Sequence, residues 1–284
     1  MARRLFGLAG APRYSRDMAS STQHPETHYS AQPSVTALIT GATAGLGAEF
    51  ARQLAAQGYS LVLVARDQER LDSTAESLRA RYAVQVQTIS ADLVTEAGVQ
   101  TVANRLADSN HPVTTLVNNA GYGLTGNFAD NDLADELTHL GIHIRTPMIL
   151  SHAALRTMAE IGGGRIINIA SAAAFTPRGT YSAAKAFMVN FSRWANVFYR
   201  DRGITVTAVC PGFTHTEFHD RMQIDKKSIP AWSWLEAEEV VRSGLTDAMA
   251  GRSVSIPSTK YKVITFLARI APDALVARIA QRGR

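Results

Sequence analysis

Tyr181 and Lys185 are the pair of residues in this sequence whose types and spacing could carry out proton chemistry. They are four positions apart in the stretch Ser171 to Lys185, which reads SAAAFTPRGTYSAAK. If the Ala-rich segment from Thr180 onward is a helix, as we expect, this spacing places the phenol and the ammonium on one helical face. A fixed cation beside a phenol favours the phenolate, so we expect the pKa of Tyr181 to be lowered towards neutral pH. Tyrosine and lysine at this spacing also occur on solvated helix faces, so the pair alone does not identify an active site.

Ser171 brings a third polar side chain to the same region. It ends the apolar run RIINIAS, which predicts a buried parallel strand. Open α/β sheets bind their ligands beyond the carboxyl ends of such strands. We therefore expect a hydroxyl, a phenol and an ammonium to converge at one edge of a sheet.

The composition indicates one α/β domain rather than several. The chain has 284 residues, 46% of them hydrophobic, and can bury one large core. Its net charge of +5 is modest and is not gathered into a basic block with interleaved aromatic residues, so we do not expect nucleic-acid binding. The single cysteine, Cys210, lies in the apolar run ITVTAVC and is expected to be a core residue. No apolar run is long enough for a transmembrane helix. We expect a cytoplasmic protein, with a location peripheral to a membrane as the alternative.

Three segments are predicted along the chain. Residues 1–33 are rich in Ala, Arg, Ser, Pro and Gln and lack periodicity, which predicts a disordered extension. A transit peptide, or an upstream start with Met18 as the true first residue, would explain the same segment. Residues 34–257 are expected to form the Rossmann-like domain, and residues 258–284 a basic amphipathic C-terminal tail.

A glycine-rich turn follows the first convincing strand. The strand VTALIT leads directly into TGATAGLG and then into the amphipathic helix AEFARQLAAQG. Such a turn lets the backbone approach a pyrophosphate, which then lies at the positive end of the helix dipole. The context of strand and helix favours dinucleotide binding over a simple tight turn.

Arg66 ends the second predicted strand, YSLVLVAR. An acidic residue here would bind the ribose hydroxyls of NAD, whereas an arginine can pair with the 2'-phosphate of NADP. Arg66 therefore favours NADP(H). The neighbouring Asp67 keeps NAD(H) open as the alternative cofactor. Arg66 could also be only a solvated charge at the end of a strand.

The remaining pattern alternates strands with helices. VQVQTIS and TTLVNNAG read as the third and fourth strands, with Asp92 and Leu93 after the third and NNAG at the end of the fourth. Repeated alternation of this kind predicts right-handed crossovers and a doubly wound parallel sheet, Rossmann-like, with a C-terminal helical extension. NNAG could be only a turn, but on the fourth strand it would lie beside the first, where a cofactor crosses.

Together these motifs resemble the short-chain dehydrogenase/reductase family, in its single-domain branch. The resemblance runs from about Val35 to the 250s and rests on TGATAGLG, Asp92-Leu93, NNAG, Ser171, YSAAK and PGFTHT, all in the family's order. It implies that Tyr181 is the general acid or base, that Lys185 lowers its pKa and holds the nicotinamide ribose, and that Ser171 binds the substrate oxygen. The resemblance and the motifs together imply that the cofactor-binding residues are Thr40, Gly41, Thr43, Gly45, Leu46, Gly47, Arg66, Asp92, Leu93, Asn119, Gly121, Tyr181, Lys185, Pro211, Gly212, Thr214 and Thr216.

His143 departs from the family pattern. It stands in LGIHIRTPMIL, where the family usually has an asparagine that holds a water in a proton relay. A histidine ring nitrogen can also relay a proton, so we expect an altered relay, with a packed helix residue as the alternative. His139 and His143 have a spacing that could bind a metal, but a third ligand is not evident and we expect no metal site.

Two further segments bear on partners. The expected helix from Ala183 to Arg202 is rich in large apolar residues, and the resemblance implies a homodimer or homotetramer through it and the preceding helix. The insertion HDRMQIDKKSIPAWSWL could be a lid in which Trp232 and Trp234 form an apolar substrate wall, although such aromatics are more often packing. The tail is expected to dock on the domain, with peripheral contact to a membrane surface as the alternative.

The sequence thus predicts an NADP(H)-dependent oxidoreductase that passes a hydride between the nicotinamide and a secondary alcohol or ketone. The expected lid and tail favour a lipophilic substrate, such as an acyl chain or a sterol-like ketone. Two alternatives remain: a non-catalytic NADP(H)-binding sensor or scaffold, and a membrane-surface module driven by the basic tail.

Overall fold

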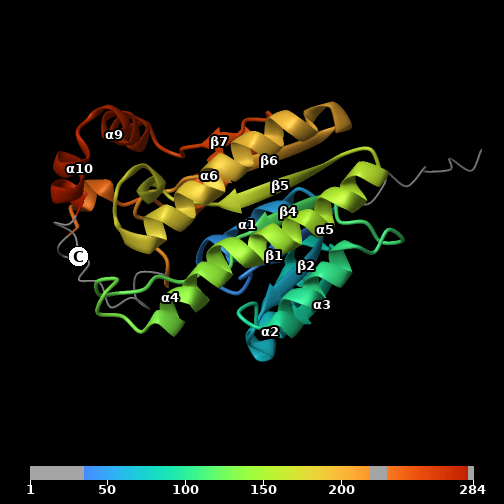
Figure 1. Cartoon of the computed structure of the whole chain (residues 1–284). Coiled ribbons are helices and arrows are strands. Elements are labelled where there is room, and N and C mark those ends of the chain that lie inside the picture. The colour runs from blue at the N-terminus through green and yellow to red at the C-terminus, as the bar shows by residue number, and fades with distance from the viewer. Residues whose placement is uncertain (1–34, 218–228, 281–284) are drawn as a thin grey trace, which may run out of the picture. The chain divides into compact units, whose positions relative to one another are not determined.

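Strands and helices alternate along almost the whole domain (Figure 1). The structure, a computed structural model, describes residues 35–217 and 229–280. Its strands are β1 Thr36–Thr40, β2 Ser60–Ala65, β3 Val86–Ser90, β4 Thr115–Asn118, β5 Gly164–Ile169, β6 Ile204–Val209 and β7 Val254–Ser255. Its α-helices are α1 Gly45–Ala56, α2 Gln68–Tyr82, α3 Glu96–Leu106, α4 Leu133–Leu140, α5 Thr146–Glu160, α6 Gly179–Tyr199, α8 Ala237–Met249, α9 Thr259–Ile270 and α10 Asp273–Ala280.

The strands form one parallel sheet in the order β3-β2-β1-β4-β5-β6-β7. Leu38 of β1 pairs with Val62 of β2 on one side and with Leu116 of β4 on the other. The chain order therefore reverses direction between β1 and β4, which is the switch point where open sheets of this kind bind ligands. The predicted doubly wound sheet is confirmed.

Helices cover both faces of the sheet because successive strand residues point to opposite sides. On one face Ile39 and Leu63 pack in a core with Phe50 of α1 and Leu245 of α8. On the other face Leu38 and Val62 pack in a core with residues of α3, α5 and α6. The near-continuous apolar runs of the sequence are thus explained by burial on two sides.

A π-helical turn, η1 Gly141–Arg145, joins α4 to α5. The predicted helix over LGIHIRTPMIL is therefore present, but it contains a wider turn than the sequence indicates. Thr146 donates its backbone N–H to the carbonyl of Gly141, five residues earlier. Turns of this type inside α-helices are frequent at functional sites, and His143 lies in this one.

Some boundaries differ from those predicted. The helix expected to begin at Thr180 or Ala183 begins at Gly179, and it ends at Tyr199 before a 3-10 turn, η3 Arg200–Arg202. The tail forms two helices, α9 and α10, as part of the unit that contains the sheet. The extension predicted for residues 1–33 and most of the expected lid, residues 218–228, lie outside the described residues. Within the described ranges, a helix with the length and apolar character to cross a membrane is not found.

Candidate active site

Ser171, Tyr181 and Lys185 meet beyond the carboxyl end of β5. Ser171 follows that strand and begins the 3-10 turn η2 Ala172–Phe175, where its Oγ accepts a hydrogen bond from the N–H of Ala173 at 3.1 Å. Tyr181 and Lys185 lie on the first turns of α6, with the Lys185 ammonium 5.6 Å from the centre of the Tyr181 ring. The expected convergence of the three side chains is present in the structure.

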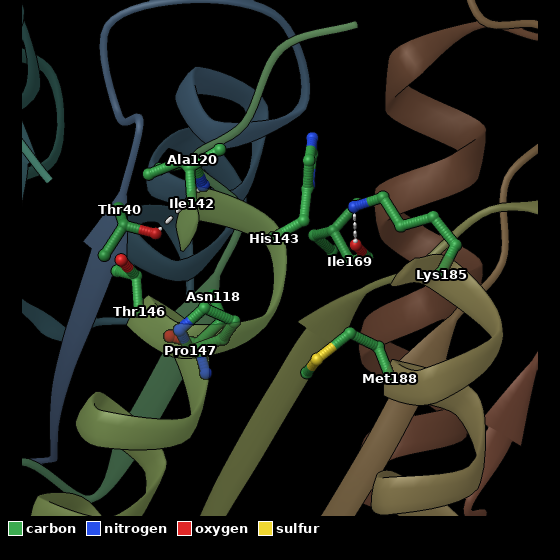
Figure 2. Close-up of a pocket in the computed structure, with 10 residues that line it drawn as sticks. All are labelled: Thr40, Asn118, Ala120, Ile142, His143, Thr146, Pro147, Ile169, Lys185 and Met188. Carbon is green, nitrogen blue, oxygen red and sulfur yellow. Dashed lines mark hydrogen bonds between the residues drawn. The ribbon is translucent and has the colours of Figure 1, made fainter. Parts of the chain in front are cut away.

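Burial dominates the ionisation of this pair. It raises the pKa of Tyr181 to about 12, against the opposing effects of a hydrogen bond with Ser171 and of the charge of Arg178. Burial likewise lowers the pKa of Lys185 to about 8. The expectation that Lys185 would lower the Tyr181 pKa towards neutrality is therefore wrong for this geometry. The lysine directs its Nζ to the carbonyl of Ile169 at 2.7 Å instead (Figure 2).

The His143 ring is buried beside Tyr181. The two ring centres are 5.5 Å apart and the planes are nearly perpendicular, at 87°. His143 Nε2 lies 2.6 Å from the carbonyl oxygen of Tyr122, which can only accept, so Nε2 carries the proton. Nδ1 is then an acceptor, and within the described part of the chain it has no hydrogen-bond partner. Burial, aided by the charge of Lys185, holds the His143 pKa well below its usual value, so the ring is neutral.

Gly121 makes room for that ring. A Cβ at this position would lie 2.4 Å from Cε1 of His143, closer than any side chain allows. The sequence assigned Gly121 to the cofactor, and the structure gives it this additional packing role. His139, fully buried one turn before His143, stacks edge-on against it at 4.5 Å between ring centres. Among the described residues, groups of three or more side chains suited to a metal ion do not occur.

Glu136 is a buried carboxylate that the sequence reasoning missed. Its Oε2 accepts a hydrogen bond from Thr180 Oγ1 at 2.6 Å, and its Oε1 accepts one from Asn131 Nδ2 at 2.8 Å. Because Thr180 precedes Tyr181, this contact ties α4 to the turn that carries the phenol. Glu136 belongs to no recognisable motif, so only the fold reveals it.

The glycine-rich turn is shaped for close approach of a ligand to the backbone. Gly41 and Gly45 have φ values of +66° and +52°, which favour glycine. A Cβ at Gly47 would lie 2.1 Å from the carbonyl oxygen of Gly41. The α1 helix that follows has no acidic residue in its first turn, and its N-cap residue, Ala44, has no polar side chain. Its free N–H groups and dipole suit a phosphate, so these residues fit a dinucleotide.

Thr40 and Asn119 hold the ends of β1 and β4 together. Thr40 Oγ1 accepts hydrogen bonds from the N–H groups of Asn119 and Ala120 at 2.9 and 3.0 Å. Asn119 Nδ2 donates to the carbonyls of Thr40 and Gly41. Both residues were predicted to bind the cofactor, and in the structure they fix the two strand ends between which a cofactor would cross.

The charged residues that follow β2 and β3 differ in their hydrogen bonds and exposure. Asp67 accepts the N–H of Arg70 at 3.0 Å and so caps α2, which engages Oδ1 of the carboxylate that could otherwise bind the ribose hydroxyls of NAD. Arg66 is exposed at the strand end. Asp92 accepts the N–H of Val94 at 3.2 Å, and the carbonyl of buried Leu93 accepts from Thr146.

Arg70 is a second arginine at this edge that the sequence reasoning missed. Its guanidinium donates to the carbonyl of Thr43 in the glycine-rich turn and pairs with Glu217, both at 3.1 Å. It therefore lies where a phosphate on the adenosine ribose would be recognised. Its place in the first turn of α2, four residues after Arg66, was the available signal.

The segment after β6 returns to the glycine-rich turn. The side chain of Thr216 lies against Gly45, where an added Cβ would be 3.1 Å from it. Thr214 is buried and its Oγ1 donates to the carbonyl of Gly212 at 3.0 Å. The carbonyl of Pro211 accepts the N–H of Ala172 at 2.8 Å, which joins this segment to the turn that follows Ser171.

A small pocket lies between the carboxyl ends of the central strands and the π-helical turn η1 (Figure 2). Lys185 reaches into it from α6, and His143 enters it from η1. Its lining residues come from β1, β4 and the residues just after it, β5, η1, α5 and α6, and are Thr40, Asn118, Ala120, Ile142, His143, Thr146, Pro147, Ile169, Lys185 and Met188.

Several known proteins are similar to this chain in sequence and in fold. The sequence profile of the short chain dehydrogenase family matches residues 35–227. Sulfoacetaldehyde reductase 2 of Chromohalobacter salexigens is 41% identical over 186 residues, which cover 64% of this chain and 73% of that protein. Very-long-chain 3-oxoacyl-CoA reductase-B of Danio rerio is 32% identical over 188 residues, 64% of this chain and 60% of that protein.

Solved structures of similar proteins have the same fold. A short-chain dehydrogenase from Sphingobium yanoikuyae in complex with NADPH superposes with a TM-score of 0.76 at 33% identity, over 81% of this chain and 91% of that one. The bulky-bulky ketone specific alcohol dehydrogenase from Comamonas testosteroni gives a TM-score of 0.73 at 31% identity, over 84% and 93% of the two chains. With the sheet, the glycine-rich turn and the Ser171, Tyr181 and Lys185 arrangement, these matches identify the chain as a member of the short-chain dehydrogenase family of oxidoreductases.

Proposed function

We propose that this oxidoreductase uses NADP(H) to interconvert a ketone and a secondary alcohol. The observation that carries the proposal is the meeting of Ser171, Tyr181 and Lys185 at the carboxyl end of β5, on the same edge of the parallel sheet as the glycine-rich turn after β1. A bound nicotinamide would supply or accept the hydride. The chain itself must bind the substrate oxygen and move one proton to or from it.

Tyr181 is suited to donate that proton. With a pKa of about 12 it is protonated at neutral pH, which is the form needed by the general acid of a carbonyl reduction. Ser171 would hold the same oxygen through its hydroxyl. The protonated phenol is thus ready for carbonyl reduction, whereas alcohol oxidation would first require its deprotonation.

Lys185 would bind the ribose of the cofactor and return a proton to Tyr181. Its pKa of about 8 leaves the ammonium largely protonated at neutral pH and allows it to release the proton readily. His143 would take the place of the usual asparagine by accepting a hydrogen bond at Nδ1. Because its pKa is low, the ring can orient a proton donor without trapping the proton itself.

NADP(H) is proposed over NAD(H) on the charges near β2. Arg66 and Arg70 supply two guanidinium groups at this edge, while Asp67 is engaged as a helix cap. Guanidinium groups pair well with phosphate, and an available carboxylate would be needed for the ribose hydroxyls of NAD. The NADPH complex of the Sphingobium yanoikuyae relative supports this choice.

A lipophilic substrate is proposed from the aromatic residues around the site. Phe175 lies in η2, four residues after Ser171, and Phe213 contacts Trp234 at 5.8 Å between ring centres. The names of a ketone-specific alcohol dehydrogenase and a 3-oxoacyl-CoA reductase among the relatives agree with a bulky or acyl ketone. The name of the sulfoacetaldehyde reductase suggests a small anionic aldehyde instead.

We further propose a homodimer or homotetramer. α6 exposes an apolar strip containing Trp194, Val197 and Phe198, of which Val197 keeps 78% of its surface accessible. Apolar patches of this kind mark interaction surfaces. Size-exclusion chromatography with light scattering would measure the number of subunits, and a monomer at micromolar concentration would contradict the proposal.

Oxidation of NADPH and NADH, followed by absorbance against ketones and aldehydes graded in size and charge, tests the function. We expect turnover with NADPH that rises with the apolar size of the ketone, and its loss in Tyr181→Phe with NADPH binding retained. One observation favours the alternative of a non-catalytic NADP(H) sensor: a histidine ring replaces the usual relay asparagine beside Tyr181. Tight NADPH binding without turnover of any substrate would support that alternative.

A further inference from the structure

Helix α9 turns its apolar side chains towards solvent rather than towards the domain. Its docked face consists of Tyr261 and Thr265, which are almost fully buried. Its outer face carries four large apolar residues that each keep between 52% and 66% of their surface exposed, namely Val263, Phe266, Leu267 and Ile270. A helix that only covered the domain would show the opposite pattern.

The orientation of α9 is fixed at its first turn. The Tyr261 ring lies over Gly212, and its hydroxyl accepts the N–H of Phe213 at 3.0 Å and donates to the carbonyl of Ser233 at 2.9 Å. Lys260 Nζ donates to the carbonyls of Trp232 and Trp234, the latter at 3.0 Å. These contacts prevent the helix from rolling to bury its apolar face.

A second contact holds the last turn. The guanidinium of Arg269 lies 4.3 Å from the centre of the Phe175 ring, and Phe175 belongs to the turn that follows Ser171. The backbone carbonyl of Trp232 accepts a bond from Lys260 in the first turn, and the Trp232 residue is 63% exposed. Helix α9 is thus held at both ends, and the backbone of the exposed Trp232 is bonded to its first turn.

The tail that contains this face is predominantly basic in sequence. The sequence from Ser258 to Arg284 contains six Lys and Arg residues and one acid, Asp273. Lys262 is exposed, and on a helical projection Lys262 and Arg269 lie together along one flank of the apolar face. α9 itself has no acidic residue. Two copies of this face meeting each other would bring like charges together, which disfavours a second copy as the occupant.

α9 lies at the edge of the sheet where the active site lies. It follows β7 and lies on the side of the sheet towards which the strand arrows point (Figure 1). Its Tyr261 and Arg269 contact residues that follow β6 and β5. The exposed strip of α6, by contrast, lies on another helix and is the surface proposed for subunit contact. The two apolar surfaces therefore call for different partners.

We propose that the outer face of α9 binds the surface of an anionic membrane. Val263, Phe266, Leu267 and Ile270 would enter the boundary between headgroups and acyl chains, and Lys262 would lie among the lipid phosphates. Trp232 would occupy the interfacial layer, where indole rings are enriched. This orientation turns the active-site edge of the sheet towards the bilayer.

Co-sedimentation of the full chain with vesicles tests the proposal. We expect binding to phosphatidylcholine vesicles that contain phosphatidylglycerol, much weaker binding to phosphatidylcholine alone, and a decrease with added salt. Phe266→Ser together with Ile270→Ser should lower the affinity by about tenfold or more, because two large apolar contacts are lost. Arg278 is an exposed basic residue of α10, the helix that follows α9. Lys262→Gln together with Arg278→Gln should lower binding to the anionic vesicles only.

Ile161→Ser together with Met249→Ser is the matched control. Both residues are exposed and apolar, but each precedes the start of a strand and so lies at the opposite edge of the sheet. The control should bind vesicles like the unchanged protein. NADPH binding and reduction of a water-soluble ketone should persist in all these variants, which separates this test from that of the proposed function.

Equal sedimentation with neutral and anionic vesicles, or an F266S/I270S variant that binds as well as the control, would overturn the proposal. A change of subunit number in F266S/I270S without vesicle binding by the unchanged protein would also overturn it, and would assign the face to a second copy. Size-exclusion chromatography of the same samples reports that outcome.

Discussion

The ring of His143 stands nearly perpendicular to the ring of Tyr181, with 5.5 Å between their centres. Its proton lies on Nε2, because that nitrogen faces the carbonyl of Tyr122. The remaining lone pair, on Nδ1, is therefore the polar group that His143 offers within the catalytic region. If that lone pair orients the returning proton, the histidine performs the task of the asparagine usual in the family.

Replacing His143 tests this role. We expect His143→Ala to lower kcat by about ten- to a hundredfold, because a general acid that is not reprotonated limits turnover. The KM for NADPH should change little, since the glycine-rich turn is untouched. His143→Asn should restore most of the rate. Steady-state kinetics of the two variants gives the comparison, and an unchanged kcat in His143→Ala would reduce His143 to a packing residue.

The same histidine should make the free energy of unfolding decrease as the pH falls into the acid range. Burial lowers the folded-state pKa of His143 and of His139 below 6.5. Below pH 6.5 the unfolded chain then binds more protons than the folded one, so the free energy of unfolding falls as the pH falls. Thermal melts between pH 5 and pH 8 should show this decline, and His143→Asn should make it shallower without removing the part due to His139. Parallel curves for the two proteins would contradict the assignment.

Carbonyl reduction should decline as the pH rises through about 8. Lys185 loses its proton near that pH, whereas Tyr181 stays protonated until about 12. The alkaline limb of kcat/KM would then report the lysine and not the phenol. A profile with NADPH and a neutral ketone measures it, with NADPH affinity followed by fluorescence as the control for cofactor loss. A flat profile up to pH 10 would contradict this origin.

The sequence predicted the fold and the central residues because both depend on local patterns. The alternation of apolar strand runs with helical segments predicts a doubly wound parallel sheet, and the spacing of Tyr181 and Lys185 on a helix places them together. The direction of the Tyr181 pKa was predicted wrongly, since it depends on how completely the surrounding helices remove water. Spacing alone carries no measure of that burial.

Contacts between distant segments were also beyond the sequence. Glu136 bonds Thr180 across two helices, and Arg70 reaches Thr43 and Glu217. None of these pairs shares a motif, so each becomes visible only once the chain has folded. The π-helical turn around His143 was likewise not predicted, because it depends on the packing of the folded chain rather than on the local composition.

Arg66 and Arg70 should determine the choice of cofactor. Substituting either by Ala removes a charge expected to face the 2'-phosphate, and a hydrogen bond to a charged group is worth about 1.5–3 kcal/mol. The KM for NADPH should therefore rise about tenfold or more, while that for NADH stays the same. The control is Arg81→Ala, because Arg81 lies in the last turn of α2, the helix that carries Arg70 in its first turn. Equal effects on both cofactors would indicate a structural role instead.

Gly212 should hold the tail in place through its lack of a side chain. A Cβ there would lie 1.8 Å from Cζ of Tyr261, so Gly212→Ala must displace the ring and the first turn of α9 with it. We expect a loss of about 1–3 kcal/mol in the free energy of unfolding, the usual cost of overpacking, measured by denaturant titration. Tyr261→Ala provides the control, because removing the ring removes the clash. In the double variant the loss should then be smaller than the sum of the two single losses, whereas strict additivity would mean that the two residues do not act on each other.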